Sequence, residues 1–207
     1  MINLKTFLLG SLMLLPLMAE AQSCCQSTND VIKTIMERRS VRKYLDKPVE
    51  HDKLATIAKC GIYAPNALNK QMWAVRVVES KEFIDGTTDA FLKEHADMAK
   101  RDKNFKNMYR NAPNIIVVAT PKDDSFGAIN AGLMGENMML AAQSLRLGTC
   151  CLGSAATFLN SSEGCKSLVA KLNLPANYTI CYVLAVGYPD EAPEAKTRDE
   201  SKIEFVK

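Results

Sequence analysis

A cluster of cationic and hydroxyl side chains follows the first helical segment of the chain. The segment from Arg38 to Tyr44 holds four positively charged side chains, and Ser40 adds a hydroxyl donor. Guanidinium groups pair with phosphate and carboxylate groups through parallel hydrogen bonds, so this cluster can bind a small anion. The alternative is a solvated face, because most Arg and Lys runs are exposed and cations near a helix C-terminus interact favourably with its dipole.

Two further segments carry groups that could contact a ligand. The loop from Ala64 to Trp73 holds two asparagines and Gln71, and it leads into a β-branched run typical of a strand. Side-chain amides at the start of a strand can hydrogen-bond the edge of a planar heterocycle, although an ordinary turn with a packed tryptophan remains the alternative. Later, Gly148 and Gly153 bracket a short segment whose backbone N–H groups could face a ligand without an intervening Cβ.

Hydrophobic periodicity and breaker residues predict the elements that position these groups. Apolar residues at helical spacing, together with capping residues and prolines, mark the helices, and short apolar or β-branched runs mark the strands. We expect helices over 28–38, 50–63, 125–147 and 161–172, two charged helices within 81–109, strands over 73–78, 115–119 and 178–186, and a last edge strand over 203–206.

The longest predicted helix contains three glycines, at Gly127, Gly132 and Gly135. Each costs about 1 kcal/mol relative to alanine in a helix interior. Close approach of the equivalent helix from a second subunit is our preferred explanation, and a weakened surface helix is the alternative.

The N-terminal 21 residues have the features of a secretory signal peptide. Lys5 precedes an apolar run, and small residues occupy the cleavage positions before Gln22. We therefore expect an exported protein with one domain over residues 22–207. Cleavage before Cys24 followed by lipid attachment is a second hypothesis. The net charge of +3 is too small to predict nucleic-acid binding.

The seven cysteines and two histidines show no metal-ligand spacing, so no metal site is predicted. Export permits disulfides, but the number of cysteines is odd and several cysteines lie in apolar contexts. We expect Cys60, Cys150, Cys151 and Cys181 to be mostly free, buried thiols.

Taken together and in this order, the segments resemble the FMN-dependent nitroreductase family. The family's R-R-S-x-R/K motif is matched at Arg38 to Arg42, its A-P-S-x-x-N-x-Q-P-W motif at Ala64 to Trp73, and its L-G-T-x-W-I-G motif at Leu147 to Gly153. Gly187 to Pro189, followed by a late basic pair, also fits. Any one motif is weak, but four in the right order are specific.

The resemblance implies an α+β fold, with a central, mostly antiparallel sheet flanked by helices in an intertwined homodimer. It also implies FMN at the subunit interface, with a C-terminal segment reaching across to the partner. The cofactor-binding residues that it implies are Arg38, Arg39, Ser40, Arg42, Pro65, Asn66, Ala67, Asn69, Gln71, Leu152, Gly153, Lys196 and Arg198.

The implied roles of these residues differ. Arg38, Arg39 and Ser40 match phosphate and ribityl contacts, and the pair Lys196 and Arg198 closes on the phosphate. The loop holding Pro65, Asn66, Ala67, Asn69 and Gln71 meets the flavin of the other subunit, while the backbone at Leu152 and Gly153 lies near the flavin N5 atom.

Arg42 matches the basic residue beside the flavin ring, where a cation would stabilise negative charge on the reduced ring. The flavin carries the hydride chemistry, so no catalytic nucleophile or histidine base is needed. In a departure from the family, Asn66 and Ala67 stand where serines are usual, and Met72 replaces the proline before Trp73. These changes put the geometry of the loop in doubt more than flavin binding.

The resulting hypothesis is an exported flavoenzyme that reduces a small nitroaromatic or quinone-type acceptor by a two-electron, ping-pong cycle, with NAD(P)H or another reductant as donor. Flavin-dependent dehalogenation, azoline oxidation and flavin consumption are alternatives within the same fold. A different alternative is a flavin-binding carrier or redox partner of another exported protein, with little turnover.

Overall fold

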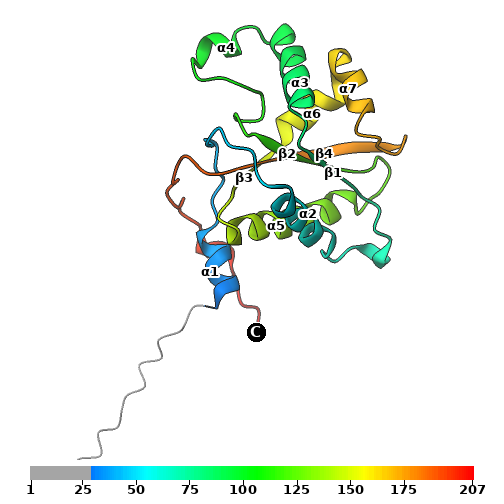
Figure 1. Ribbon diagram of the computed structural model, residues 1–207. Helices are drawn as coiled ribbons and strands as arrows, with labels where there is room; N and C mark the ends of the chain where they lie inside the picture. Colours follow the sequence, from blue (N-terminus) through cyan, green and yellow to red (C-terminus); the bar gives the residue numbers. More distant parts are fainter. Residues whose placement is uncertain (1–28) are drawn as a thin grey trace, which may run out of the picture.

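Four antiparallel strands form the sheet around which the chain folds (Figure 1). The computed structural model describes residues 29–207, so the predicted signal peptide and the lipidation hypothesis at Cys24 lie outside the described residues. The strands are β1 (Ala74–Val78), β2 (Asn114–Pro121), β3 (Gly148–Leu152) and β4 (Tyr178–Gly187), in the spatial order β1-β2-β4-β3.

The central strand β2 explains why the sheet is covered on both faces. All eight of its residues are buried, as the unbroken apolar run predicts. Successive side chains of a strand point to opposite faces. Accordingly, Ile115 and Val117 belong to one hydrophobic cluster, whereas Ile116 and Val118 belong to the other.

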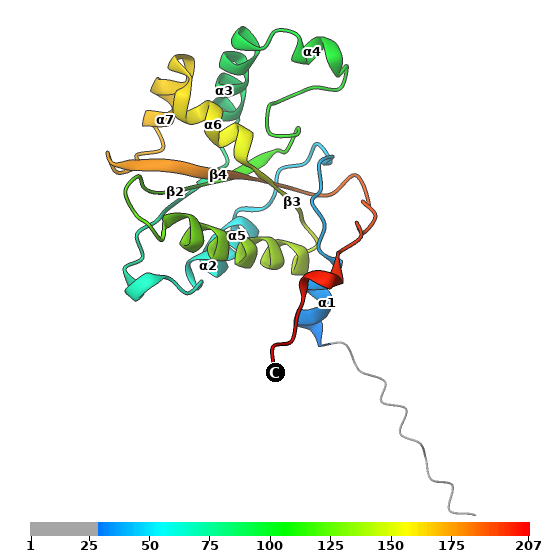
Figure 2. The same ribbon diagram turned by 180° about the vertical axis from the view of Figure 1, so that it is seen from behind.

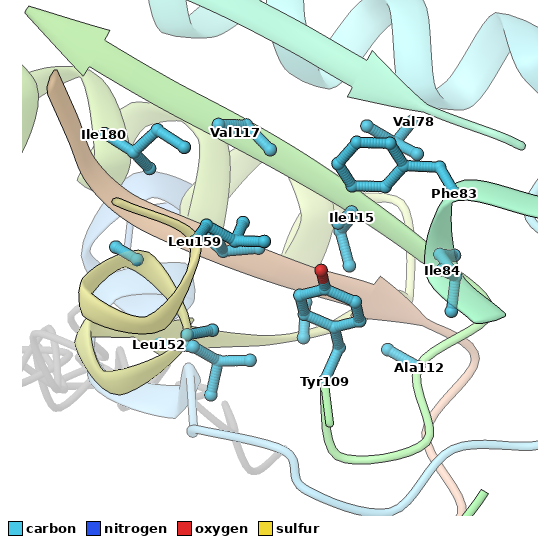
Figure 3. Packing of buried hydrophobic residues seen from close by; sticks show 14 of the residues in the cluster. Val78, Phe83, Ile84, Tyr109, Ala112, Ile115, Val117, Leu152, Leu159 and Ile180 are labelled. Atoms are coloured by element: carbon cyan, nitrogen blue, oxygen red, sulfur yellow. The ribbon is translucent and has the colours of Figure 1, made fainter. Parts of the chain in front are cut away.

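Helices cover the two faces of the sheet as two separate layers (Figures 1 and 2). One layer contains α2 (His51–Ile62) and α5 (Gly127–Ser144). The other contains α3 (Lys81–Glu94), α6 (Gly153–Ser161) and α7 (Lys166–Ala170), and Figure 3 shows its packing around Tyr109, Ile115 and Leu159. The short helix α4 (Met98–Arg101) follows α3, and α1 (Asp30–Glu37) lies outside both layers.

The segment 148–154, for which the sequence predicts no helix or strand, is strand β3 followed directly by α6, because residues 148–152 pair with β4. Three sequence predictions about secondary structure are wrong or incomplete. The helix expected over 161–172 is instead α6, a 3-10 turn (Glu163–Cys165) and the short α7. Only four residues of the second helix expected within 81–109 are helical. Residues 203–206 pair with no strand of the described chain and are exposed.

The glycines of α5 are explained mainly within the chain, not by a second subunit. A Cβ on Gly127 would lie 2.7 Å from Oγ1 of Thr120, and a Cβ on Gly135 would lie 2.8 Å from the hydroxyl oxygen of Tyr182. Only Gly132 has nothing within 4 Å of the Cβ position. The subunit-contact explanation therefore survives for Gly132 alone.

Two glycines at one end of the sheet make room for the segment after α1. Gly148 and Gly187 face each other across β3 and β4. A Cβ on Gly148 would lie 2.8 Å from Cβ of Val41, and a Cβ on Gly187 would lie 2.8 Å from Cδ1 of Tyr44. We call this pair of positions the glycine notch, because it lets the segment from Val41 to Tyr44 pack directly on the sheet.

The glycine notch yields a test of stability. We expect Gly148→Ala to lower the free energy of unfolding by about 1–3 kcal/mol, because the added methyl group overlaps Val41. In a double-mutant cycle, Val41→Ala should recover part of that loss, since it removes Cγ1 and Cγ2 of Val41, two of the three atoms that the new Cβ meets. Urea unfolding of the wild type, both single variants and the double variant measures the coupling, and additive effects would contradict the proposed contact.

Candidate functional site

The cation-rich segment leaves α1 as extended chain. The side chain of Asn29 caps the helix by accepting a hydrogen bond from the Val31 N–H at 2.9 Å. At the other end, Arg38 has φ −58° and ψ 135°, which ends the helix. Arg39 turns back, and its Nη1 donates to the carbonyls of Met36 at 2.6 Å and Arg38 at 2.8 Å. Arg39 thus hydrogen-bonds carbonyl groups at the C-terminus of α1. This is the structural role that the alternative explanation of the cation cluster gives to cations near a helix end.

Arg38 is the cation that faces the body of the protein. Its Nε lies 3.3 Å from Oε1 of Glu136 on α5, and 21% of its side chain is exposed. This ion pair directs the guanidinium toward α5, while leaving part of it accessible to a ligand.

Backbone hydrogen bonds fix the segment from Ser40 to Leu45 between β3 and the chain that follows β4. The Val41 N–H donates to the Thr149 carbonyl at 2.9 Å, and the Leu45 N–H donates to the Tyr188 carbonyl at 2.9 Å. The Arg42 N–H donates to Oε1 of Glu191 at 2.5 Å. The side chain of Arg42 is thereby held at the surface, where its Nη1 donates to the Ser40 carbonyl at 3.2 Å.

Arg42 and Leu152 line one cavity of about 890 Å³. Its walls come from the segment after α1, the chain between α3 and β2, the start of α6 and the chain after β4. Besides Arg42 and Leu152, they include Lys43, Tyr44, Asp46, Phe91, Met98, Asp102, Asn104, Phe105, Lys106, Asn107, Met108, Arg110, Asn111, Ser154, Ala155, Asp190 and Glu191.

Two guanidinium groups shape the electrostatics of this cavity. Burial raises the pKa of the Cys150 thiol, while the charges of Arg42 and Arg110 oppose that shift. Burial likewise raises the pKa of the Tyr44 hydroxyl, which donates to the Val41 carbonyl at 2.6 Å. Positive charge from two separate segments therefore acts on the same part of the cavity.

The described cysteines are all free thiols, which agrees with the sequence prediction. Their burial agrees only in part, because Cys150 and Cys165 are buried, Cys60 and Cys181 are partly buried, and Cys151 is exposed. Cys151 lies on β3, one of the two edge strands, and points to the opposite face of the sheet from Cys150, which belongs to a buried cluster.

A second hydrogen-bonded group fixes the start of the C-terminal tail. The hydroxyl of Tyr188 donates to Oε2 of Glu50 at 2.5 Å and accepts from Nζ of Lys53 at 2.7 Å. These contacts lower the pKa of the Glu50 carboxyl to about 2, with the Tyr188 hydrogen bond as the largest cause. The tail therefore leaves the sheet at a defined point, three residues before Glu191.

The predicted flavin-contacting loop is strained and internally braced. Leu68, Asn69 and Gln71 have φ between 51° and 54°, a left-handed conformation that residues other than glycine rarely adopt. Oδ1 of Asn66 accepts from the Gln71 N–H at 2.8 Å. Asn66, which departs from the usual serine, therefore holds the loop closed.

The loop also has an anchor on α5 that sequence reasoning missed. The Ala67 N–H donates to Oδ1 of Asn130 at 3.2 Å, and Asn130 is only 4% exposed. In the sequence, Asn130 could have been recognised as a polar residue on the apolar side of a predicted helix. For Glu136 the signal was a single charge within an otherwise uncharged helix, whereas nothing in the sequence distinguished Arg110.

Within one chain, the predicted site residues fall into separate groups. Arg38, Arg39, Ser40 and Arg42 lie together, and Leu152 shares a cavity with Arg42. Gly153 begins α6 beside them. The loop at 65–71, which includes the exposed Pro65, lies beyond the opposite end of the α2–α5 pair from α1 (Figure 1).

Lys196 and Arg198 form the last group, in the exposed tail. Nη1 of Arg198 donates to the carbonyls of Lys196 at 3.0 Å and Thr197 at 3.4 Å. In residues 29–207, neither side chain forms an ion pair. Their predicted role at a phosphate stays a prediction, as do the roles of the other site residues.

Comparison with known proteins decides the family. The model of the Nitroreductase family matches residues 35–188, which include the cation-rich segment, the strained loop and the whole sheet. The chain belongs to the nitroreductase family.

Similar proteins and solved structures agree with this family membership. The chain is 30% identical over 189 residues to the FMN reductase [NAD(P)H] of Bacillus subtilis, covering 82% of this chain and 70% of that protein. It is 28% identical over 174 residues to the NADPH-flavin oxidoreductase of Vibrio harveyi, with 82% and 70% covered. A nitroreductase from Bacteroides fragilis, solved with bound FMN, superimposes with a TM-score of 0.74 at 27% identity, covering 87% of this chain and all of that one.

The predicted fold class is therefore confirmed as the nitroreductase fold, an α+β arrangement around an antiparallel sheet. In residues 29–207, no group of three or more acidic, histidine or cysteine side chains could hold a metal ion. None of the helices in this range is long and apolar enough to span a membrane.

The hydrogen bond between Tyr188 and Glu50 predicts a pH dependence of stability. Because the pKa of Glu50 is lower in the folded protein, its stabilising effect is present above the unfolded value of 4.5 and is lost as the pH falls toward 2. Urea unfolding of the wild type and Glu50→Gln should show a difference at about pH 7 that shrinks at about pH 3. The same difference at both pH values would contradict this assignment.

Proposed function

We propose that this protein is an FMN-dependent oxidoreductase that takes two electrons from NADH, NADPH or another reductant and passes them to a nitroaromatic or quinone-type acceptor. One observation carries the proposal. In a chain of the nitroreductase family, the segment holding Arg38, Arg39, Ser40 and Arg42 packs beside β3 and borders the same cavity as Leu152. The FMN bound in the Bacteroides fragilis relative supports this assignment.

The chemistry of the residues fits a flavin mononucleotide. Three guanidinium groups and one hydroxyl within five residues suit a phosphate monoester, which carries close to two negative charges. The cavity of about 890 Å³ next to Arg42 falls within the size range of small-molecule and cofactor sites. Its walls combine aromatic and methionine side chains with a few polar groups, as such sites usually do.

The bound flavin would supply the hydride and electron transfer, so the chain has to bind and orient it. Arg38, Arg39 and Ser40 would hold the phosphate and ribityl chain, and Lys196 and Arg198 would close on the phosphate from the tail. Arg42 would lie beside the ring and stabilise negative charge there. A ping-pong order of donor and acceptor is part of the proposal, because one site would serve both in turn.

We further propose a homodimer with FMN at the subunit interface. The helix α1 is amphipathic but has no buried residue, and Val31, Ile35 and Met36 are 63%, 49% and 70% exposed. Ile129 and Leu133 on α5, and Phe126 just before it, are also exposed. Exposed apolar surface of this extent on two helices is typical of a protein–protein interface.

The separation of the site residues supports the same assembly. One chain holds the cationic group at one end of the α2–α5 pair and the strained loop 65–71 beyond the other end. A two-fold axis could bring the loop of one subunit to the cationic group of its partner. The exposed Gly132 leaves room for close approach of a second helix.

The proposal includes export, which the first 21 residues support by their composition alone. If the protein acts outside the cytoplasm, a reductant other than NAD(P)H becomes a candidate donor. A carrier or redox-partner role with little turnover is then the second candidate function.

Spectroscopy of the purified protein tests the function. Protein reconstituted with FMN should be yellow, and its absorbance near the flavin band should bleach with NADPH, NADH or a quinol and return with a nitroaromatic. Parallel lines in double-reciprocal plots would support the ping-pong order. A stable flavin colour that no donor bleaches would favour the carrier, and no flavin uptake would refute every FMN-based function.

A substitution at Arg38 tests the phosphate site. We expect Arg38→Ala to weaken FMN affinity by about 1.5–3 kcal/mol, the typical contribution of a hydrogen bond to a charged group. Lys33→Ala is the matched control, because it removes a positive charge from the exposed surface of α1. Fluorescence titration of FMN into both variants measures the change, and equal affinities would remove Arg38 from the site.

A charged residue on α1 tests the interface. We expect Ile35→Glu to weaken self-association by at least about 2 kcal/mol, the cost typical of a disrupted interface centre. Lys33→Glu, on the same helix, should leave association close to that of the wild type. Analytical ultracentrifugation over a range of protein concentrations reports the association constants, and a monomeric wild type would contradict the proposed assembly.

A further inference from the structure

Arg110 lines the cavity from the chain between α4 and β2, and the cation-rich segment lines the same cavity through Arg42 and Lys43. Its φ is 61°, and the φ of the next residue, Asn111, is 62°. Two consecutive residues other than glycine therefore adopt the left-handed conformation. Backbone strain of this kind persists only where the surrounding structure imposes it, and it is concentrated at functional sites.

Asparagine side chains impose this conformation. Oδ1 of Asn111 accepts from the N–H groups of Lys106 at 2.7 Å and Asn107 at 3.0 Å, and its Nδ2 donates to the Asn104 carbonyl at 2.8 Å. On the inner side, Tyr109 is fully buried and anchors the loop in the core (Figure 3). Arg110 is thus an exposed side chain on a backbone that is fixed from both sides.

The guanidinium of Arg110 is available to a ligand. Within residues 29–207, it makes no hydrogen bond and no ion pair, and the side chains of Arg42 and Lys43 have no carboxylate partner either. Lys106, by contrast, is paired with Asp46 at 2.9 Å. Three cations of the cavity wall therefore lack a carboxylate within ion-pair distance in the part of the chain that the structure describes.

Two carboxylates in the wall of the cavity already accept hydrogen bonds from backbone N–H groups. Oδ1 of Asp102 accepts from the Asn104 N–H at 2.9 Å, and Oε1 of Glu191 accepts from the Arg42 N–H at 2.5 Å. Asp190 is the remaining acid, and its own N–H donates to the Lys43 carbonyl. Arg42 and Arg110 both line the cavity together with Tyr44, and the charges of both guanidinium groups act on the Tyr44 hydroxyl.

A different part of the wall is apolar and aromatic. Phe91, Met98, Phe105 and Met108 all line the cavity. The rings of Phe91 and Phe105 are nearly parallel, at an interplanar angle of 19° and with centroids 6.4 Å apart. Flat aromatic ligands pack well against such side chains. The cavity therefore combines an aromatic wall with two guanidinium groups that have no carboxylate partner within residues 29–207.

We propose that Arg110, together with Arg42, binds the anionic group of an aromatic carboxylate, so that Arg110 selects acidic aromatic acceptors over neutral ones. This inference rests on the proposed oxidoreductase function, in which the cavity beside Arg42 borders the flavin ring and also receives the acceptor. Guanidinium groups pair with carboxylates in a bidentate geometry that a neutral amide cannot reproduce, which is the basis of the selection.

The test measures binding to oxidised, FMN-loaded protein with three probes that cannot be reduced as nitro compounds can. Isothermal titration calorimetry with benzoate, benzamide and benzylamine compares an anion, a near-isosteric neutral ligand and a cation. We expect benzoate to bind about tenfold more tightly than benzamide, as charge-assisted hydrogen bonds predict, and benzylamine to bind least tightly.

The variants isolate Arg110. Arg110→Gln should abolish the preference for benzoate, and Arg110→Lys should retain part of it. Arg146→Gln is a matched control, because Arg146 is also exposed, has a φ of 59° and does not line the cavity. This control should keep the wild-type preference.

The outcomes separate this inference from the proposed function. A wild type that binds benzoate no better than benzamide or benzylamine, or that binds none of them, would overturn the inference even if the FMN spectrum and turnover are normal. An unchanged preference in Arg110→Gln would overturn it as well. Failure of the protein to take up FMN would instead refute the proposed function. The same titrations on the flavin-free protein would then test the anion site, which a benzoate preference that depends on Arg110 would support and equal binding of the three probes would overturn.

In turnover, the same selection should appear between 4-nitrobenzoate and 4-nitrobenzamide. Arg110→Gln should lower kcat/KM for the acid about tenfold, mostly through KM, and leave the amide within about twofold. An equal loss for both acceptors would show a structural defect instead of lost selection, and would count against the role of Arg110.

Discussion

The close packing of the segment from Val41 to Tyr44 on the glycine notch is the contact on which the arrangement of the site depends. Gly148 and Gly187 lie opposite each other in neighbouring strands, and each accommodates one side chain of this segment. Hydrogen bonds to Thr149 and to the chain after β4 then fix its direction. The cations have long, flexible side chains, so only a fixed backbone can hold them at one place.

Sequence reasoning predicted the cation-rich segment, the loop at 65–71 and three of the strands, because each has a strong local signal. Charge clusters, prolines and β-branched runs can be recognised within ten residues of chain. Strand β3 was not predicted, and the omission has a physical cause, since glycine is depleted in strands and the pairing partner β4 is what makes this segment a strand. The predicted subunit contact at the glycines of α5 was wrong at two of the three positions for a similar reason. The side chains that require these two glycines, Thr120 and Tyr182, cannot be recognised as their neighbours from the sequence.

Other parts of the site could not be predicted locally. The partner of Arg38 is Glu136, which lies 98 residues later, and the anchor of Ala67 is Asn130, which lies 63 residues later. Arg110 carries no motif, and its importance follows from the asparagine contacts that set its backbone and from the cavity that it borders. Contacts of this kind arise from the folded topology and not from any spacing along the chain.

The lack of any buried residue in α1 has a consequence for how the protein should behave on dilution. A helix of eight residues is marginal in water without tertiary support. In the proposed dimer, that support comes from the second subunit, so ordering of α1 is linked by mass action to subunit concentration. Retention of the cofactor would then depend on how much protein is present, and dilution of the proposed dimer would remove its flavin and its quaternary structure together.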